Sequence, residues 1–255
     1  MHTEQKEKIS YTTEYVVGAG YLLFFCLAFS LYSIFFYFTY LQPKPAPINT
    51  FATNLPPKTP TPHILSKNQQ NVSTIFEDDF HDDVHDWSYT GDYSSTSVKQ
   101  GKLFLEARQE NSYGYIVCKS CPYLNKPFYL QADFSTSEAT DKSFGIIFNH
   151  DSRSDRFYLF QINTEAKKYY LYHHTAQDWS LRAAGESDQI KSFPAVNTLG
   201  MYVDQNLIEL YVNGKIIDSY KQSGYSFHKG SFAFFIDGSD FRLAIDNLVI
   251  KYTGT

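Results

Sequence analysis

The chain has 255 residues, a net charge of −5 and 19% charged residues, which gives it room for one or two folded domains. This mild acidic balance carries no basic footprint, so the composition argues against nucleic-acid binding. Tyr and Phe number 21 and 22, and aromatic residues make up 18% of the chain. Because aromatic side chains favour the pleated, half-buried surface of a sheet, the composition favours β structure.

The first feature in chain order is an apolar run near the N-terminus. Residues 15–41 contain no charged side chain. A helix needs about 20 apolar residues to cross a bilayer, whereas the apolar part of a cleaved signal peptide has roughly 7–15. The run therefore predicts an uncleaved, single-pass transmembrane signal anchor, preceded by a short cytoplasmic tail at residues 1–14.

The next segment, residues 42–74, is rich in Pro, Thr and Asn and has few side chains that could form a core. Such a composition predicts an extended linker. The positive charges that flank the apolar run are nearly balanced, with Lys6 and Lys8 before it and Lys44 and Lys58 after it. A linker of this kind typically holds a module away from a membrane surface. We therefore expect an extracellular or periplasmic C-terminal domain.

An acidic stretch, "IFEDDFHDDVHDW", follows at residues 75–87. Its centre, His81-Asp-Asp-Val-His85, differs by one methylene from the H-E-x-x-H motif of zinc peptidases. That motif needs both histidines on one helical face with a glutamate base between them, and here Asp82 takes the place of the glutamate. The neighbouring residues are strand-like before the motif and turn-like after it, which argues against a zinc peptidase.

The same stretch is better interpreted as the start of a folded domain. Ile75, Phe76 and Phe80 are predicted to anchor the first strand, and Trp87 to pack back onto the domain. The acidic residues would then form a solvated strand edge and an exit turn.

From residue 75 to residue 252, short alternating runs recur with turn signals between them and without an amphipathic helix. They cover 102–107, 127–135, 143–149, 156–163, 167–174, 198–204, 207–213, 215–220, 230–237 and 240–252. Asn213-Gly214 is a strong hairpin signal between two of them. Repeated strands without intervening helices predict an all-β fold, an antiparallel β-sandwich of two packed sheets.

Cys118 and Cys121 form a C-x-x-C pair after the strand-like residues 113–117. No helical pattern follows that could lower a thiol pKa, which argues against redox catalysis. A second pair, which a structural zinc site would need, is also lacking. A local disulfide and two free thiols both remain open.

The order of these segments resembles the concanavalin A-like lectin/glucanase superfamily, and in particular laminin G-like jelly-roll modules on the exported side of bacterial membrane proteins. The resemblance spans nearly all of residues 75–252. It is carried by these segments: "FEDDF…W", "GKLFLEA", "FGIIFNHDSRSDRFYLFQI", "KYYLYHHTAQDWSLRAA", "NTLGMYVDQNLIELYVNGKII" and "LAIDNLVI". It implies a jelly roll, in a superfamily that contains both enzymes and binding modules.

Members that resemble laminarinases carry their catalytic carboxylates in an E-x-D-x-x-E strand. The nearest match here, Glu186-Ser-Asp188-Gln-Ile-Lys191, ends in lysine and lies in a predicted loop. We therefore expect a module without catalytic activity. A polysaccharide-active enzyme is the less favoured alternative.

The resemblance also implies candidate ligand contacts, because lectin-like sheets bind sugars with aromatic and polar side chains. The candidates are Trp179, Tyr158, Tyr170, Tyr172, Arg182, Tyr202 and Tyr211. Trp179 is the strongest, since it lies in a predicted polar turn after a strand. No cofactor is implied by a motif. The resemblance also suggests a calcium ion at Asp78, Asp79 and Asp246, where the first and last strands are expected to pair, although no calcium-loop pattern is present.

The sequence thus predicts a membrane-anchored, lectin-like recognition module that binds a glycan or a protein surface. The alternative is a structural or assembly component of a membrane or envelope complex, with no small ligand.

Overall fold

The computed structural model describes residues 72–109, 113–222, 229–239 and 241–253. The predicted tail, the apolar run at 15–41 and the linker up to residue 71 lie outside the described residues. In the part that is described, no helix is long and apolar enough to span a membrane. The described residues form strands and connecting loops without a helix, so the predicted all-β class is confirmed for them.

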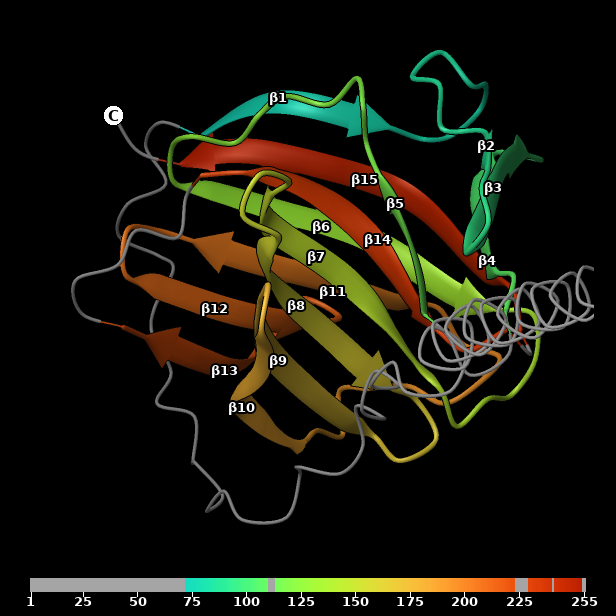
Figure 1. Ribbon diagram of the computed structural model, residues 1–255. Helices are drawn as coiled ribbons and strands as arrows, with labels where there is room; N and C mark the ends of the chain where they lie inside the picture. The colour runs from blue at the N-terminus through green and yellow to red at the C-terminus, as the bar shows by residue number, and fades with distance from the viewer. Residues whose placement is uncertain (1–71, 110–112, 223–228, 240, 254–255) are drawn as a thin grey trace, which may run out of the picture. The chain divides into compact units, whose positions relative to one another are not determined.

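The large sheet contains nine antiparallel strands in the order β13-β12-β11-β6-β15-β4-β3-β2, with β1 also pairing with β15 (Figure 1). Its strands are β1 (Val72–Asp78), β2 (Tyr89–Thr90), β3 (Ser94–Lys99), β4 (Lys102–Ala107), β6 (Phe128–Thr136), β11 (Asn197–Val203), β12 (Leu207–Val212), β13 (Lys215–Lys221) and β15 (Leu243–Thr253). The first and last strands pair, as expected. Residues 72–74, predicted to end the linker, already belong to β1 because they pair with residues 251–253.

The small sheet contains six antiparallel strands in the order β10-β9-β8-β7-β14-β5. They are β5 (Tyr113–Val117), β7 (Ser143–Asp151), β8 (Arg156–Asn163), β9 (Lys168–Thr175), β10 (Asp178–Glu186) and β14 (Ser231–Asp237). Three strands were not predicted as such, namely β3, β10 and the two-residue β2. Strand β3 is rich in serine, and β10 is interrupted by a bulge between Leu181 and Ala183, so neither shows clean alternation.

The sandwich core lies between the two sheets and follows the predicted alternation. Phe144, Ile146 and Phe148 of β7 all belong to the buried core. Across the gap, the ring of Phe134 from β6 lies 5.8 Å from the ring of Phe144 and 5.8 Å from that of Phe234. These contacts join the two sheets through aromatic side chains, and burial of their apolar area drives the packing.

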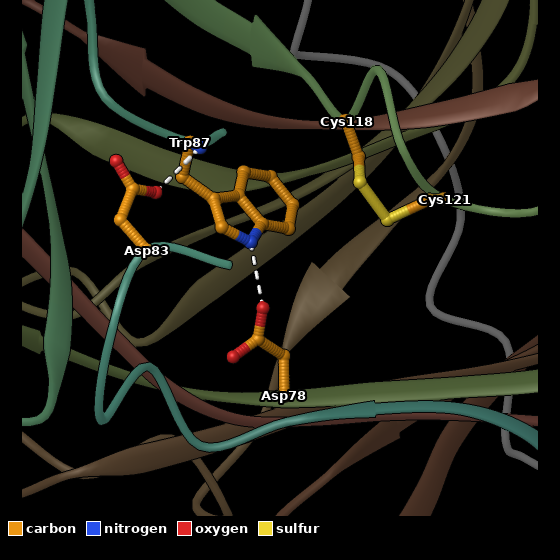
Figure 2. The surroundings of a disulfide bond; sticks show 5 residues. All are labelled: Asp78, Asp83, Trp87, Cys118 and Cys121. Atoms are coloured by element: carbon orange, nitrogen blue, oxygen red, sulfur yellow. Dashed lines mark hydrogen bonds between the residues drawn. A yellow bond between two sulfur atoms is a disulfide. The ribbon is translucent and has the colours of Figure 1, made fainter. Parts of the chain in front are cut away.

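The acidic stretch ends β1 and continues as a loop that packs onto this core. Phe80 has a positive φ of 53° and is fully buried. Trp87 is also buried, and its Nε1 donates a 2.7 Å hydrogen bond to Oδ2 of Asp78 (Figure 2). The backbone N–H of Phe80 donates to the other oxygen, Oδ1, at 2.8 Å. The prediction for Trp87 is confirmed.

The prediction that all the acidic residues are solvated is wrong for Asp78, which is only 8% exposed. The physical reason is that two donors, an indole and an amide, are buried beside it and each needs an acceptor. The carboxylate of Asp78 supplies one acceptor oxygen for each donor. His81 and His85 lie in the loop and not on a helix, which agrees with the argument against a zinc peptidase.

Cys118 and Cys121 are joined by a disulfide, with their Cα atoms 5.3 Å apart (Figure 2). Of the two alternatives left open by the sequence, a local disulfide and two free thiols, the structure shows the disulfide. Cys118 directly follows β5 and is buried against the core. The bond holds the end of this strand to the chain that leaves it.

Candidate functional site

One face of the small sheet packs against the large sheet, and its outer face is unusually apolar. On this outer face five large apolar side chains are buried although they do not belong to the sandwich core. They are Ile147, Phe157, Leu159, Tyr172 and Phe235. We call these five residues the floor. They make β7 and β8 apolar on both faces, which explains the continuous apolar runs in the sequence.

The outer face is concave. The rings of Tyr113 on β5 and Trp179 on β10 have centroids 6.5 Å apart, although β5 and β10 are the two edge strands. In a flat sheet five spacings of about 4.8 Å would separate them by about 24 Å, which is more than two aromatic side chains can span. The sheet therefore curls, so that side chains from its two edges meet above the floor.

Above the floor lies a second set of rings, which are partly exposed. This upper layer consists of Tyr113, Tyr115, Tyr170, His174 and Trp179. Trp179 contacts His174 at 4.5 Å and the floor residue Phe157 at 5.4 Å, both measured between ring centroids. Such tilted and edge-to-face pairs stabilise the cluster beyond the burial of area alone.

Trp179 does not lie in a polar turn, as predicted, but in strand β10. Residue 178 already pairs with Thr175 across a tight hairpin, so the strand resumes before Trp179. Arg182 is the extra residue of the following bulge. The polar residues around Trp179 therefore belong to an edge strand and its hairpin.

The other predicted contacts divide among three places. Tyr170 and Tyr172 share the concave face with Trp179, and their rings stack at 5.9 Å, but Tyr172 is buried in the floor. Tyr158 lies in the sandwich core, because it alternates with the outward Phe157 and Leu159. Its burial corrects its assignment as a ligand contact.

Arg182 lies on the same inner side as Tyr158. Its Nη2 approaches Nδ1 of His173 at 3.2 Å, and the ring of His173 stacks on that of Tyr158 at 4.5 Å. Burial, followed by the positive charge of Arg182, lowers the pKa of His173 to about 4. Arg182 therefore packs at the margin of the core and not on the concave face.

Tyr202 and Tyr211 lie on the outer face of the large sheet, away from the concave face. The hydroxyl of Tyr211 donates to Oε2 of Glu209 at 2.8 Å, and its ring meets Tyr129 edge-on at 5.6 Å. Tyr211 is buried. Burial and the Glu209 carboxylate raise its pKa, so this tyrosine stays neutral and structural.

The ring residues of the floor and the upper layer that sequence reasoning missed are Tyr113, Tyr115, Phe157, His174 and Phe235. Alternation within one strand identifies an outward position, but it does not say that an outward aromatic ring meets others. One usable signal was present, namely the apolar residues on both alternating faces of β7 and β8.

Polar acceptors are buried on the same outer side. His150 is 8% exposed, its ring lies 6.2 Å from that of Tyr115 and 5.9 Å from that of Phe157, and its Nδ1 has no hydrogen-bond partner. Oε1 of Gln161, on β8, is likewise buried and without a partner. Burial lowers the pKa of His150, so its imidazole is neutral near pH 7 and keeps one acceptor nitrogen.

The proposed calcium ligands do not form a site. Both oxygens of Asp78 accept internal hydrogen bonds, and Oδ1 of Asp79 and of Asp246 accept from backbone amides. Among the described residues no three His, Cys, Asp or Glu side chains converge in a way that could hold a metal ion. The donor set therefore does not fit calcium at the predicted position.

A scan of the sequence against models of known families gives no match, and neither does a search of curated protein sequences. Solved structures with the same fold are found. A protein of unknown function with a galectin-like fold from Bacillus subtilis has a TM-score of 0.60 at 13% identity and covers 71% of this chain and 96% of its own. The chain has a concanavalin A-like fold.

Two further structures show what this fold carries elsewhere. The carbohydrate-binding module CBM66 from Bacillus subtilis has a TM-score of 0.51 at 12% identity, covering 62% of this chain and 91% of its own. An endo-β-1,3-glucanase from Pyrococcus furiosus has a TM-score of 0.54 at 10% identity, covering 72% and 95%. At these identities the likeness establishes the concanavalin A-like fold alone.

Proposed function

We propose that the chain is a glycan-binding module whose concave face is the binding surface. The observation that carries this proposal is the upper layer of rings, with Trp179 at its centre. The apolar C–H faces of sugars pack on flat aromatic side chains, and a few well-placed polar groups then fix the orientation. The concanavalin A-like fold of a carbohydrate-binding module and of glucanases supports the same choice.

The module binds glycans without cleaving them. A retaining glycosidase needs two carboxyl groups about 5–5.5 Å apart on either side of the scissile bond. The centre of the described concave face is formed by Gly145, Ile147, Leu159 and Gln161, none of which is a carboxylate. The sequence, in addition, lacks the E-x-D-x-x-E motif.

The module stands outside the cytoplasm on an N-terminal anchor formed by residues 15–41. The Cys118–Cys121 disulfide supports this part of the proposal, because disulfides persist mainly in oxidising compartments. Protease added to intact cells, or to spheroplasts where an outer membrane encloses the cell, should remove the C-terminal domain. Full protection of the domain in both preparations, with cleavage only after lysis, would place it in the cytoplasm.

A glycan array probed with the full-length protein in detergent micelles tests the binding function. We expect binding to at least one glycan class, reduced at least tenfold by Trp179→Ala with an unchanged circular dichroism spectrum. Release of reducing ends from the bound glycan would show that the protein is an enzyme. A blank array would overturn the glycan-binding proposal.

One observation favours the second candidate function, a structural component without a small ligand. The concave face is filled by the chain's own rings, and the floor is buried without a ligand. An exposed aromatic layer of this kind also suits contact with another protein. A blank array together with a membrane protein that co-purifies in stoichiometric amount would support this candidate.

A further inference from the structure

The filled concave face restricts how a glycan can lie on it. Phe235 and Leu159 are fully buried and Ile147 is 1% exposed, so a ligand cannot touch the centre of the floor. Above them, the rings of Tyr113 and Trp179 meet from opposite edges of the sheet. A cleft that follows a long sugar chain across the sheet would have to pass through this contact. Only the margins of the upper layer offer room for a sugar.

One margin combines an exposed ring with a buried acceptor. Tyr115, at the β5 edge, is 36% exposed, whereas the neighbouring His150 is 8% exposed and has an unpartnered Nδ1. Asn149, the preceding residue, is also nine-tenths buried and its Oδ1 lacks a partner. A buried acceptor without a donor is costly and rare in folded proteins, and a ligand group that donates would satisfy it.

The backbone at this margin departs from regular strand geometry. The register between β7 and β8 shifts between Phe148 and Asp151, and Asn149 in this bulge has a positive φ of 53°. Bulges re-aim side chains and are common beside binding sites. Here the bulge falls at Asn149 and His150, the two residues that carry the unpartnered acceptors.

The charge around this margin selects the kind of ligand. The carboxylate of Asp155, in the β7–β8 hairpin, acts electrostatically on Tyr113, Tyr115 and His150, and it helps to raise the pKa of both tyrosines, after burial. A negative charge here repels uronic acids and sulfated sugars. Neutral sugars, whose hydroxyls donate hydrogen bonds, match the acceptors.

We propose that this margin binds the single terminal sugar of a neutral glycan, with the sugar ring against Tyr115 and one hydroxyl donating to Nδ1 of His150. The proposal rests on the glycan-binding function proposed above and specifies which part of a glycan is recognised. Tyr115 is on an edge strand and exposed, so rotation of its side chain uncovers the acceptor. The rest of the glycan then extends into solvent.

The first test compares ligand lengths by calorimetric titration of the full-length protein in detergent micelles. The probes are the glycan found on the array, in lengths from one to six sugars, and the methyl glycosides of glucose, galactose, mannose, fructose and N-acetylglucosamine. Chain-end recognition predicts that one methyl glycoside binds within about tenfold of the longest chain. Affinity that rises with every added sugar up to six would overturn it.

The second test removes the acceptor. His150→Phe keeps a ring of similar shape but no acceptor, and we expect about tenfold weaker binding from the lost hydrogen bond. His150→Asn restores an acceptor and should recover part of the affinity. Tyr202→Phe, on the opposite outer face, is the matched control and should bind as the original protein does.

The outcomes separate the two proposals. A blank array overturns the glycan-binding function and this inference together. Glycan binding that depends on Trp179 but is unchanged in a folded His150→Phe variant leaves the function standing and overturns the inference alone. If His150→Phe fails to fold, Tyr115→Ala replaces it, because removal of this exposed ring should weaken binding about tenfold without loss of structure. Unchanged binding by Tyr115→Ala would equally overturn the inference.

Discussion

The hydrogen bond between Trp87 and Asp78 yields the most sharply defined stability prediction. Trp87→Phe keeps an aromatic ring against Phe80, whose centroid lies 5.5 Å away, and against Phe234, at 5.7 Å. It removes the indole N–H that donates to Asp78 Oδ2 at 2.7 Å. The carboxylate, only 8% exposed, then loses a donor that water cannot easily replace.

Two contributions determine the expected loss. A hydrogen bond to a charged group contributes about 1.5–3 kcal/mol. The smaller ring gives up about 40 Å² of buried apolar area, or about 1 kcal/mol at about 25 cal/mol per Å². The free energy of unfolding should therefore fall by about 2.5–4 kcal/mol, which corresponds to a Tm lowered by about 5–16 °C for a domain of this size.

Urea unfolding, followed by circular dichroism and repeated with Asp78→Asn and the double variant, measures this loss. Asparagine keeps one acceptor oxygen for the two donors, so the two single substitutions remove one shared interaction, and the double variant should lose at least 1 kcal/mol less than their sum. Trp179→Phe is the matched control and should cost less than about 1 kcal/mol, because Trp179 is partly exposed. A Trp87→Phe loss below about 1 kcal/mol, or strict additivity, would show that the hydrogen bond between Trp87 and Asp78 does not stabilise the domain as expected.

Three further predictions concern the fold. Gly145→Ala should lower the free energy of unfolding in urea by more than about 3 kcal/mol, since its Cβ would lie 1.9 Å from the backbone oxygen of Phe160. In the control variant Gly91→Ala the added Cβ would meet only the movable ring of Tyr89, so the loss should be less than about 1 kcal/mol. Equal losses in the two variants would contradict this explanation. Because burial lowers the pKa of His173 to about 4, below the ordinary value of about 6.5, the unfolded state binds more protons between these values. The free energy of unfolding should therefore be constant above about pH 6.5 and should fall as the pH is lowered towards 5, with about 1 kcal/mol of the fall due to His173 after solvent screening. In a series of Tm measurements across this pH range, His173→Gln should reduce the slope. An unchanged slope would exclude His173 as its source. Finally, the double variant Cys118→Ala/Cys121→Ala opens a loop with a sequence separation of 3 and should lower the free energy of unfolding by about 2 kcal/mol. If the variant is as stable as the original protein under oxidising conditions, the disulfide does not contribute to stability.

Local patterns in the sequence were sufficient to predict the sandwich and to assign its core faces. Successive side chains of a strand point to opposite faces, so alternation in runs such as residues 143–149 directly assigns Phe144, Ile146 and Phe148 to the core. The hairpin at Asn213-Gly214 was predictable for a similar reason, because its turn requires positive φ, and the structure has φ of 50° and 75° there. Both properties are local in the chain.

Which outward rings form a common surface could not be predicted from the sequence and depends on how the small sheet curls. Tyr113 and Trp179 come from opposite edges of the small sheet and meet because that sheet curls, a property that no single strand encodes. The same limit separated the predicted contacts, placing Tyr158 in the core and Tyr211 on the other sheet. It also gave Asp78 a buried partner in Trp87. Curvature and partner choice depend on the packing of distant segments, so they become visible only when both sheets are assembled.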